Sequence, residues 1–130
     1  MIVVDASALL EALLRTPAAK AVEKWLFGLE QTLHAPHLLD VEVAQVIRRY
    51  AANGEIDNDR GGAALADLAD LPLQRYPHDF LLPRVWDLRS NLTAYDAVYI
   101  ALAEALDAPL LTRDRRLAAA AGHYARVELV

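Results

Sequence analysis

Short apolar runs typical of β-strands alternate with longer segments of helical periodicity along this chain. Residues 2–4, Ile-Val-Val, form an unbroken β-branched run, which is typical of a strand buried on both faces. Further strand-like runs follow at residues 33–35, 71–75, 110–112 and 126–130. Because parallel strands need helical crossovers between them, this alternation predicts an α/β fold. We expect a three-layer α/β/α sandwich around a central parallel sheet of four or five strands.

The segments between these runs predict the helices of the two outer layers. Their expected limits are residues 8–15, 17–29, 38–52, 57–69, 80–90, 95–106 and 115–121. Ser7 is a possible N-cap of the first helix. The segment 95–106 is apolar nearly all round, interrupted only by Asp96 and Glu104, so we expect it to form a central, buried helix.

Length and composition favour one compact domain. With 130 residues, of which 55% are hydrophobic, the chain has ample material for a packed core, and we expect a single domain over residues 1–130. No run approaches the roughly 18 apolar residues of a membrane span. The N-terminus lacks the basic start and long apolar stretch of a secretory signal. The chain has no cysteine, which excludes a disulfide framework and a thiolate metal site. These features predict a cytoplasmic protein with no membrane partner.

The charge balance argues against a general electrostatic grip on nucleic acid. The formal net charge is −5, whereas nucleic-acid-binding domains are usually basic. A nucleic-acid substrate would therefore need local basic patches and bound cations. Arg113, Arg115 and Arg116 form one such patch, and their planar guanidinium groups suit phosphate contacts. The same residues are equally compatible with a solvated loop and helix start.

Two acidic residues follow predicted strands. Asp5 comes directly after the strand at residues 2–4, and Asp114 lies two residues beyond the strand at 110–112. Open parallel sheets bind their ligands beyond the carboxyl ends of the strands, so both side chains are expected at that edge. Asp114 could instead be a plain helix N-cap, and Asp5 could tie down the turn that follows it.

Two further acidic residues lie in the opening turns of apolar helices. Glu42 lies at the margin of the apolar stripe of the helix predicted over residues 38–52. Its alternatives are a snorkelling side chain or a salt bridge to Arg49. Asp96 follows Thr93 by three residues, a spacing that matches a capping box. A capped helix start is also a rigid base for a ligand, so both interpretations of Asp96 can hold together.

Four converging carboxylates would have a clear chemical use. Crowded carboxylates repel one another, and a divalent cation relieves that repulsion and keeps them ionised. All-oxygen sites suit Mg²⁺ or Mn²⁺, which lower the pKa of a bound water and stabilise a leaving oxygen in phosphodiester hydrolysis. A carboxylate not fully used in metal binding could serve as general base. Ser7 and Thr112 could hold water at such a site, or could be simple cap and strand-end hydroxyls.

Four segments that contain these acids resemble one known family. Residues 3–10 (VVDASALL) resemble the opening of PIN domains, in particular the VapC-type toxins of bacterial type II toxin–antitoxin systems. Residues 36–44 (PHLLDVEVA) are similar to that family's second motif. Residues 92–103 (LTAYDAVYIALA) are similar to its third motif, the most specific of the set, and residues 111–117 (LTRDRRL) are similar to its fourth. The resemblance covers nearly the whole chain.

The resemblance implies a PIN-like α/β/α sandwich with Mg²⁺- or Mn²⁺-dependent endoribonuclease activity. Asp5, Glu42, Asp96 and Asp114 fall on the acidic positions of the family, which bind metal and carry out catalysis. Arginines follow Asp114 where some members have another acid, so no fifth ligand is expected there. The resemblance also implies an RNA substrate, a homodimer, and a cognate small DNA-binding antitoxin that covers the acidic groove.

Two other functions fit the sequence less well. A signalling receiver domain also gathers acids around Mg²⁺, but it needs adjacent acids after its first strand and a lysine late in the chain. Here Asp5 stands alone, and the only lysines are Lys20 and Lys24. A catalytically inactive PIN-like module that binds RNA or protein is the remaining alternative, and the intact set of four acids argues against it.

Overall fold

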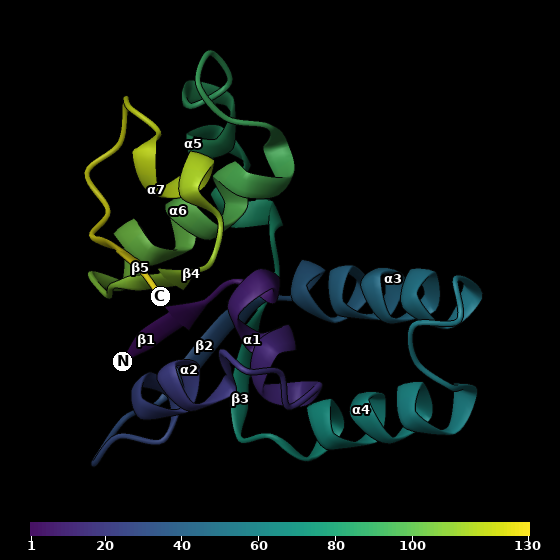
Figure 1. Ribbon diagram of the computed structural model, residues 1–130. Helices are drawn as coiled ribbons and strands as arrows, with labels where there is room; N and C mark the ends of the chain where they lie inside the picture. Colours follow the sequence, from purple (N-terminus) through teal and green to yellow (C-terminus); the bar gives the residue numbers. More distant parts are fainter.

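The computed structural model describes the whole chain, residues 1–130 (Figure 1). Five strands form one parallel sheet in the order β3-β2-β1-β4-β5. They are β1 (Ile2–Val4), β2 (Leu33–Pro36), β3 (Leu73–Tyr76), β4 (Leu110–Thr112) and β5 (Val127–Leu129). The predicted α/β class is confirmed, with the larger of the two expected strand numbers.

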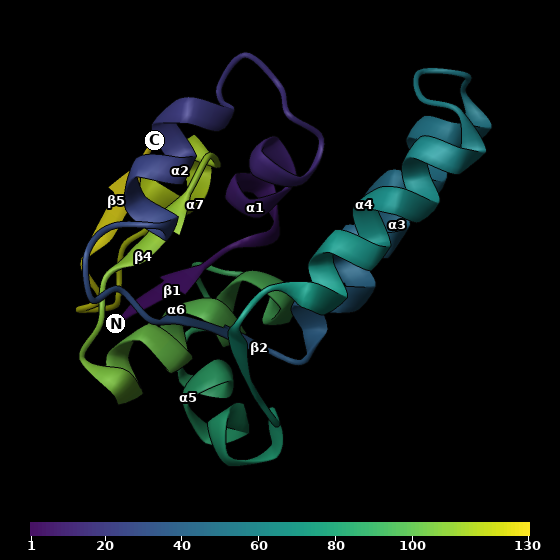
Figure 2. The same ribbon diagram turned by 90° about the horizontal axis from the view of Figure 1, so that it is seen from below.

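Helices cover both faces of this sheet. α1 and α2 lie on one face and α5, α6 and α7 on the other, whereas α3 and α4 pair as a hairpin that projects from the body (Figures 1 and 2). The helices are α1 (Ala6–Leu13), α2 (Ala19–Leu26), α3 (Leu38–Ala52), α4 (Asn58–Asp70), α5 (Leu82–Asp87), α6 (Ala94–Leu106) and α7 (Arg115–Ala119), with a 3₁₀ turn (Asp79–Leu81) before α5. None of them combines the length and apolarity needed to cross a bilayer.

The core lies between the central strands and the helices on either side. All three side chains of β1 are fully buried, as expected of a middle strand that is covered on both faces. α6 packs against β1, β2 and β4, and its side chains at residues 97–103 are all buried. The prediction of a central helix there is confirmed. Burying one such valine, leucine or isoleucine contributes about 1.5–3 kcal/mol, so this contact fixes α6 firmly under the sheet.

The α3–α4 hairpin is fixed by close packing and by a tie to α1. A Cβ atom on Gly61 would lie 3.1 Å from Cγ2 of Ile47, so the absence of a side chain lets α4 approach α3 closely. Arg60 donates a hydrogen bond from Nη2 to the carbonyl oxygen of Leu13 at 2.6 Å. The last carbonyls of a helix lack partners within it, and Arg60 supplies one at the end of α1. The hairpin is therefore anchored although it projects.

All the predicted helices are present, but all except α3 differ from their predicted limits by one to three residues. For example, α5 spans Leu82–Asp87 rather than residues 80–90. α1 begins at Ala6 rather than at residue 8, with Asp5 in the N-cap position, so Ser7 lies inside the first turn and the predicted Ser7 cap is wrong. α2 ends at Leu26 rather than at residue 29. Glu30 adopts a left-handed conformation with φ of 62°, and a chain in that conformation does not continue a right-handed helix.

Candidate active site

The acids that follow β1 and β4 meet at one edge of the sheet. These strands are neighbours, and the strand order reverses between them, since β2 and β3 lie to one side and β5 to the other. Such a reversal leaves a crevice beyond the carboxyl ends of the strands. Asp5 directly follows β1 and Asp114 follows β4. Both side chains line a pocket of about 350 Å³.

Two helices contribute further acids to the same pocket. Glu42 projects from the second turn of α3, and Asp96 from the first turn of α6. The four carboxylates come from distant parts of the sequence, and only the fold brings them together. The pocket therefore has a half at the sheet edge, made by Asp5 and Asp114, and a half on helices, made by Glu42 and Asp96.

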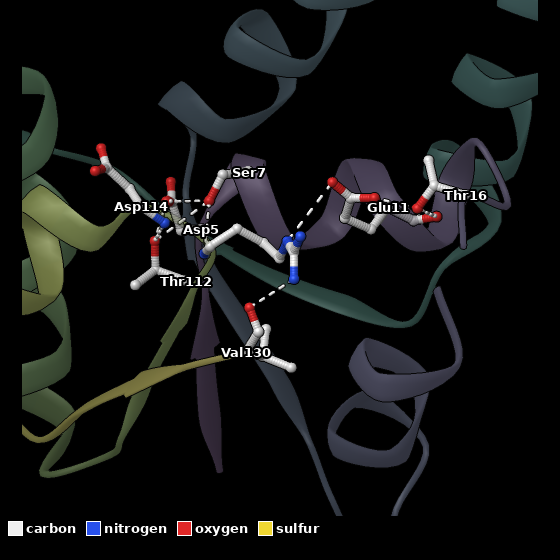
Figure 3. A network of polar contacts seen from close by, with 8 residues as sticks. Asp5, Ser7, Glu11, Thr16, Thr112, Asp114 and Val130 are labelled. Carbon is white, nitrogen blue, oxygen red and sulfur yellow. Dashed lines mark hydrogen bonds and ion pairs between the residues drawn. The ribbon is translucent and has the colours of Figure 1, made fainter. Parts of the chain in front are cut away.

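Asp5 is held by two hydroxyl groups. Thr112 Oγ1 donates to Asp5 Oδ2 at 2.7 Å, and Ser7 Oγ donates to the same oxygen at 2.8 Å (Figure 3). Each hydroxyl also accepts a backbone hydrogen bond: Ser7 Oγ from the amide of Arg113 at 3.0 Å, and Thr112 Oγ1 from the amide of Asp114 at 3.0 Å. The two hydroxyls predicted to support the site thus orient Asp5 and tie it to the loop after β4.

Asp114 both caps α7 and faces the pocket. Its Oδ1 accepts hydrogen bonds from the backbone amides of Arg116 at 2.9 Å and Leu117 at 3.4 Å. The plain helix N-cap weighed as an alternative is therefore present. It does not remove Asp114 from the pocket, because the same residue forms part of its lining.

Asp96 stands on a capped helix start, as predicted. Thr93 is the N-cap of α6, and its Oγ1 accepts a hydrogen bond from the amide of Asp96 at 3.2 Å. The cap fixes the first turn of α6, and the half-buried side chain of Asp96 lines the pocket.

Glu42 is held by a tyrosine from another helix. The hydroxyl of Tyr99, on α6, donates to Glu42 Oε1 at 2.5 Å. Arg49, the alternative partner considered for Glu42, forms no ion pair with it and lines the pocket separately. Glu42 therefore occupies the margin of the apolar stripe with a defined partner in the core.

Burial and nearby negative charge raise the pKa of Asp5, Glu42 and Asp96. Burial raises the pKa of Asp5, and the charge of Asp114 adds to this, although the Thr112 and Ser7 hydroxyls oppose it. Burial also raises the pKa of Glu42 and of Asp96, and for both the charge of Asp5 contributes. A cation in the pocket would reverse these effects, because it favours the charged forms.

The donor set fits a hard divalent cation. Every candidate ligand is a carboxylate or hydroxyl oxygen, the type that Mg²⁺ and Mn²⁺ prefer, and no cysteine is available for a softer metal. In their present rotamers, no three acidic or histidine side chains surround a single point closely enough to hold an ion together. The pocket therefore matches the cation in chemistry and placement, and binding would require the carboxylates to turn towards it.

Three further pocket residues were not picked out from the sequence. Glu11 lies one helical turn after Ser7 on α1, and Arg49 and Tyr50 lie two turns after Glu42 on α3. Helical spacing from Ser7 and Glu42 could have identified them, because residues four, seven or eight positions apart share a helix face. Arg49 and Tyr50 give the acidic pocket a basic and aromatic wall, and Glu11 adds a further carboxylate.

The predicted basic cluster divides in the structure. Arg113 lines the pocket, where its Nε lies 3.7 Å from Glu11 Oε1 and its Nη1 donates to the carbonyl oxygen of Val130 at 2.8 Å (Figure 3). Arg115 and Arg116 are exposed at the start of α7 and do not form part of the pocket lining. Of the three arginines, Arg113 is thus the one that lines the pocket, while Arg116 Nε lies 3.9 Å from Asp114 Oδ1.

His34 and His78 make structural hydrogen bonds away from the acids. His34 bonds through its two ring nitrogens to the hydroxyls of Thr32 and Tyr76, at 2.8 and 2.7 Å. His78 Nε2 accepts the amide of Leu38 at 2.7 Å, at the start of α3. None of the four histidines lines the acidic pocket.

The fold and pocket define a small α/β protein built around an acidic cluster at a strand-order switch point. Comparison with known proteins gives the family: the PIN domain pattern matches residues 2–123. The chain is also 47% identical over 129 residues to "Ribonuclease VapC1" of Mycobacterium tuberculosis, covering 98% of this chain and 96% of that protein. The chain belongs to the PIN-domain family, among the VapC ribonucleases.

Solved structures agree with this assignment. The crystal structure of PAE2754 from Pyrobaculum aerophilum superposes with a TM-score of 0.70 at 27% identity, covering 97% of this chain and 81% of that one. A toxin–antitoxin complex from Klebsiella pneumoniae gives a TM-score of 0.66 at 18% identity, covering 92% of this chain and 91% of the matched chain. The second likeness shows the shared fold.

Proposed function

We propose that this protein is an endoribonuclease toxin of the VapC type, which hydrolyses RNA phosphodiester bonds with the help of Mg²⁺ or Mn²⁺. The observation that carries the proposal is the gathering of Asp5, Glu42, Asp96 and Asp114 in one pocket. The near full-length similarity to a protein named as a ribonuclease supports it.

Each part of the pocket has a definite task in this mechanism. The four carboxylates would hold the cation, which would supply Lewis acidity and lower the pKa of a bound water. The Ser7 and Thr112 hydroxyls keep Asp5 in a fixed orientation, so little reorganisation of this residue would be needed when substrate binds. A carboxylate oxygen not used to hold the cation would serve as the general base.

Basic residues on the pocket wall place the RNA. Arg113 and Arg49 line the pocket beside the acids, where a phosphate next to the scissile bond would lie. Arg115 and Arg116 are exposed nearby and extend this basic surface along the RNA backbone. These local charges offset the net negative charge of the chain where the substrate approaches.

We also propose that the protein has an antitoxin partner. The VapC-type family and the toxin–antitoxin complex with the same fold support a cognate small DNA-binding antitoxin that covers the acidic pocket in the cytoplasm. A short reading frame next to the gene, encoding such an antitoxin, would be direct genetic support.

A homodimer is supported by an exposed apolar surface. Leu82 and Trp86 of α5, 56% and 67% exposed, line a groove of about 420 Å³. Tyr95 of α6, 65% exposed, lines a second groove that shares Leu82 with the first. Contiguous apolar surface of this kind marks interaction sites. Light scattering on the purified protein is expected to give twice the chain mass, and Trp86→Glu is expected to give a monomer.

An RNA cleavage assay with the purified protein tests the proposed ribonuclease activity. Structured RNA is expected to be cut in Mg²⁺ or Mn²⁺, with EDTA abolishing cleavage and added metal restoring it. Asp5→Asn and Asp96→Asn are each expected to lower the rate by roughly a thousandfold or more, as loss of metal or general-base chemistry does. The control is Asp70→Asn, at an exposed residue outside the pocket, with unchanged activity.

The outcomes separate the two candidate functions. Cleavage that persists in both Asp5→Asn and Asp96→Asn would reject the mechanism. Equal inactivity of wild type and variants across RNA pools, with RNA still bound, would favour an inactive PIN-like binding module.

A further inference from the structure

We propose that Tyr99 is a positioning residue of the site: its hydroxyl holds one oxygen of Glu42 and leaves the other oxygen for the pocket. This inference rests on the proposed function, because it assigns Tyr99 a role through a carboxylate that faces the cation. Tyr99 itself does not line the acidic pocket. The sequence identifies it only as one residue of an apolar helix.

The geometry of the contact is the first support. Tyr99 OH donates to Glu42 Oε1 at 2.5 Å, a short hydrogen bond of the charge-assisted type. Tyr99 is only 1% exposed. A buried phenol cannot rotate its ring freely in a close-packed core, so its hydroxyl is a fixed point. The oxygen that it holds is fixed with it.

The placement of Tyr99 on α6 is the second support. Tyr99 lies three residues after Asp96, so it is on the same side of α6, one turn deeper in the core. Its bond to Glu42 is the only side-chain hydrogen bond between α3 and α6. One face of α6 thus supplies one pocket acid directly and orients the other, and the helix half of the site depends on α6.

Glu42 depends on a single hydrogen-bond partner. Its side chain has more rotatable bonds than an aspartate, and no backbone amide or second hydroxyl binds its carboxylate. Asp5, by contrast, has two hydroxyl donors. Without Tyr99, the Glu42 carboxylate would have to be ordered when the cation binds, and this ordering would weaken binding.

The test is Tyr99→Phe, which removes one oxygen atom from the core. Mn²⁺ binding to the protein without RNA, followed by electron paramagnetic resonance, is expected to weaken by about 10- to 100-fold, the usual effect of losing a group that orients a metal ligand. The value of kcat is expected to fall while KM for RNA changes by less than about twofold, because Tyr99 does not contact the substrate.

The matched control is Tyr76→Phe. Tyr76 also loses a buried hydrogen bond, made at 2.7 Å to His34 Nδ1, but it lies away from the acidic pocket. Its Mn²⁺ affinity is expected to stay within about twofold of wild type, although its stability falls by a similar amount, about 1–3 kcal/mol. If Tyr99→Phe weakens Mn²⁺ binding and Tyr76→Phe does not, a general loss of stability cannot explain the difference.

A double-mutant cycle shows whether Tyr99 acts through Glu42. In a Glu42→Gln background, Tyr99→Phe is expected to change Mn²⁺ affinity no further, because the carboxylate that it orients is gone. A full additional loss in that background would overturn the proposal.

The remaining outcomes are also decisive. If wild type and Tyr99→Phe bind Mn²⁺ equally well, the proposed role of Tyr99 is overturned and the proposed function stays intact. Wild type that binds no Mn²⁺ would instead overturn the proposed function. Circular dichroism checks that Tyr99→Phe is folded, and an unfolded variant is titrated again in trimethylamine N-oxide, which strengthens burial.

Discussion

The two halves of the acidic pocket are held in different ways. At the sheet edge, Asp5 is bound by two hydroxyls and Asp114 by two backbone amides. On the helices, Glu42 has a single hydrogen-bond donor, Tyr99. Chain topology sets the first half, because parallel strands end at one edge, whereas the second half depends on how α3 and α6 pack. The sheet-edge half should therefore be rigid and the helix half adjustable.

Among the variants that compare the two halves, the largest effect is expected from removing a hydroxyl at the sheet edge. Thr112→Val keeps the shape of a fully buried side chain but deletes the donor to Asp5 and the acceptor for the Asp114 amide. We expect kcat/KM to fall by about 10- to 100-fold. The free energy of unfolding should fall by about 1–3 kcal/mol, because a buried amide loses its partner. Single-turnover cleavage and urea denaturation measure the two effects.

Two comparison variants sharpen this result. Thr93→Val removes the N-cap under Asp96 and should cost about 1 kcal/mol of stability but less activity, since the helix half is adjustable. Thr32→Val deletes a hydroxyl bonded to His34, remote from the pocket, and should leave cleavage unchanged. If Thr112→Val loses stability but cuts RNA at the wild-type rate, the sheet-edge hydroxyl serves the fold alone.

The sheet-edge half was also the easier one to predict from sequence. The β-branched run before Asp5 and the apolar run before Asp114 identify buried parallel strands, and parallel strands place their following residues at one edge. That deduction needs no knowledge of strand order or side-chain rotamers. It placed both acids correctly, and the Asp114 cap did not conflict with it.

Other features could not be predicted because they depend on packing between distant elements. Ser7 was expected to be a helix cap, yet its hydroxyl binds Asp5 and also contacts Thr112. The contact with Thr112 joins residues 105 positions apart and depends on where β4 lies. The Tyr99–Glu42 bond joins residues 57 positions apart and follows from how α6 lies under the sheet. Sequence periodicity marks Tyr99 as a core residue, but it cannot show what its hydroxyl meets.

The stability of the metal-free protein should depend on pH in a way that separates the halves. Folding raises the pKa of Asp5, Glu42 and Asp96, mainly through burial. Protonated forms of such groups stabilise the fold. Their contribution is complete below the pKa values of the unfolded chain and is lost as pH rises through the raised values. In EDTA, the melting temperature should therefore fall as pH rises above about 4.

Asp5→Asn and Glu42→Gln show which half carries this dependence. Asp5 is 8% exposed and Glu42 is half-buried, so Asp5→Asn should flatten the pH dependence more. Mg²⁺ should raise the melting temperature more at neutral than at acidic pH, because it binds the ionised carboxylates. If the melting temperature depends on pH equally in wild type and Asp5→Asn, the Asp5 carboxylate does not titrate as the structure indicates.

The smallest effect concerns the arginines beside the two halves. Arg113 is tied to Glu11 and to the Val130 carbonyl, whereas Arg49 has no ion pair and is free to meet a phosphate. We expect Arg49→Ala to raise KM for RNA by a few-fold, and to reduce the slope of log affinity against log salt by about 0.7, the value for one contact to single-stranded nucleic acid. Arg48→Ala, at the exposed neighbouring position, should leave KM and the salt slope unchanged, since on α3 it is Arg49, and not Arg48, that lines the pocket. Equal effects of the two substitutions would mean that the α3 arginines act only as a general positive field, and that the helix half contributes acids but no specific RNA contact.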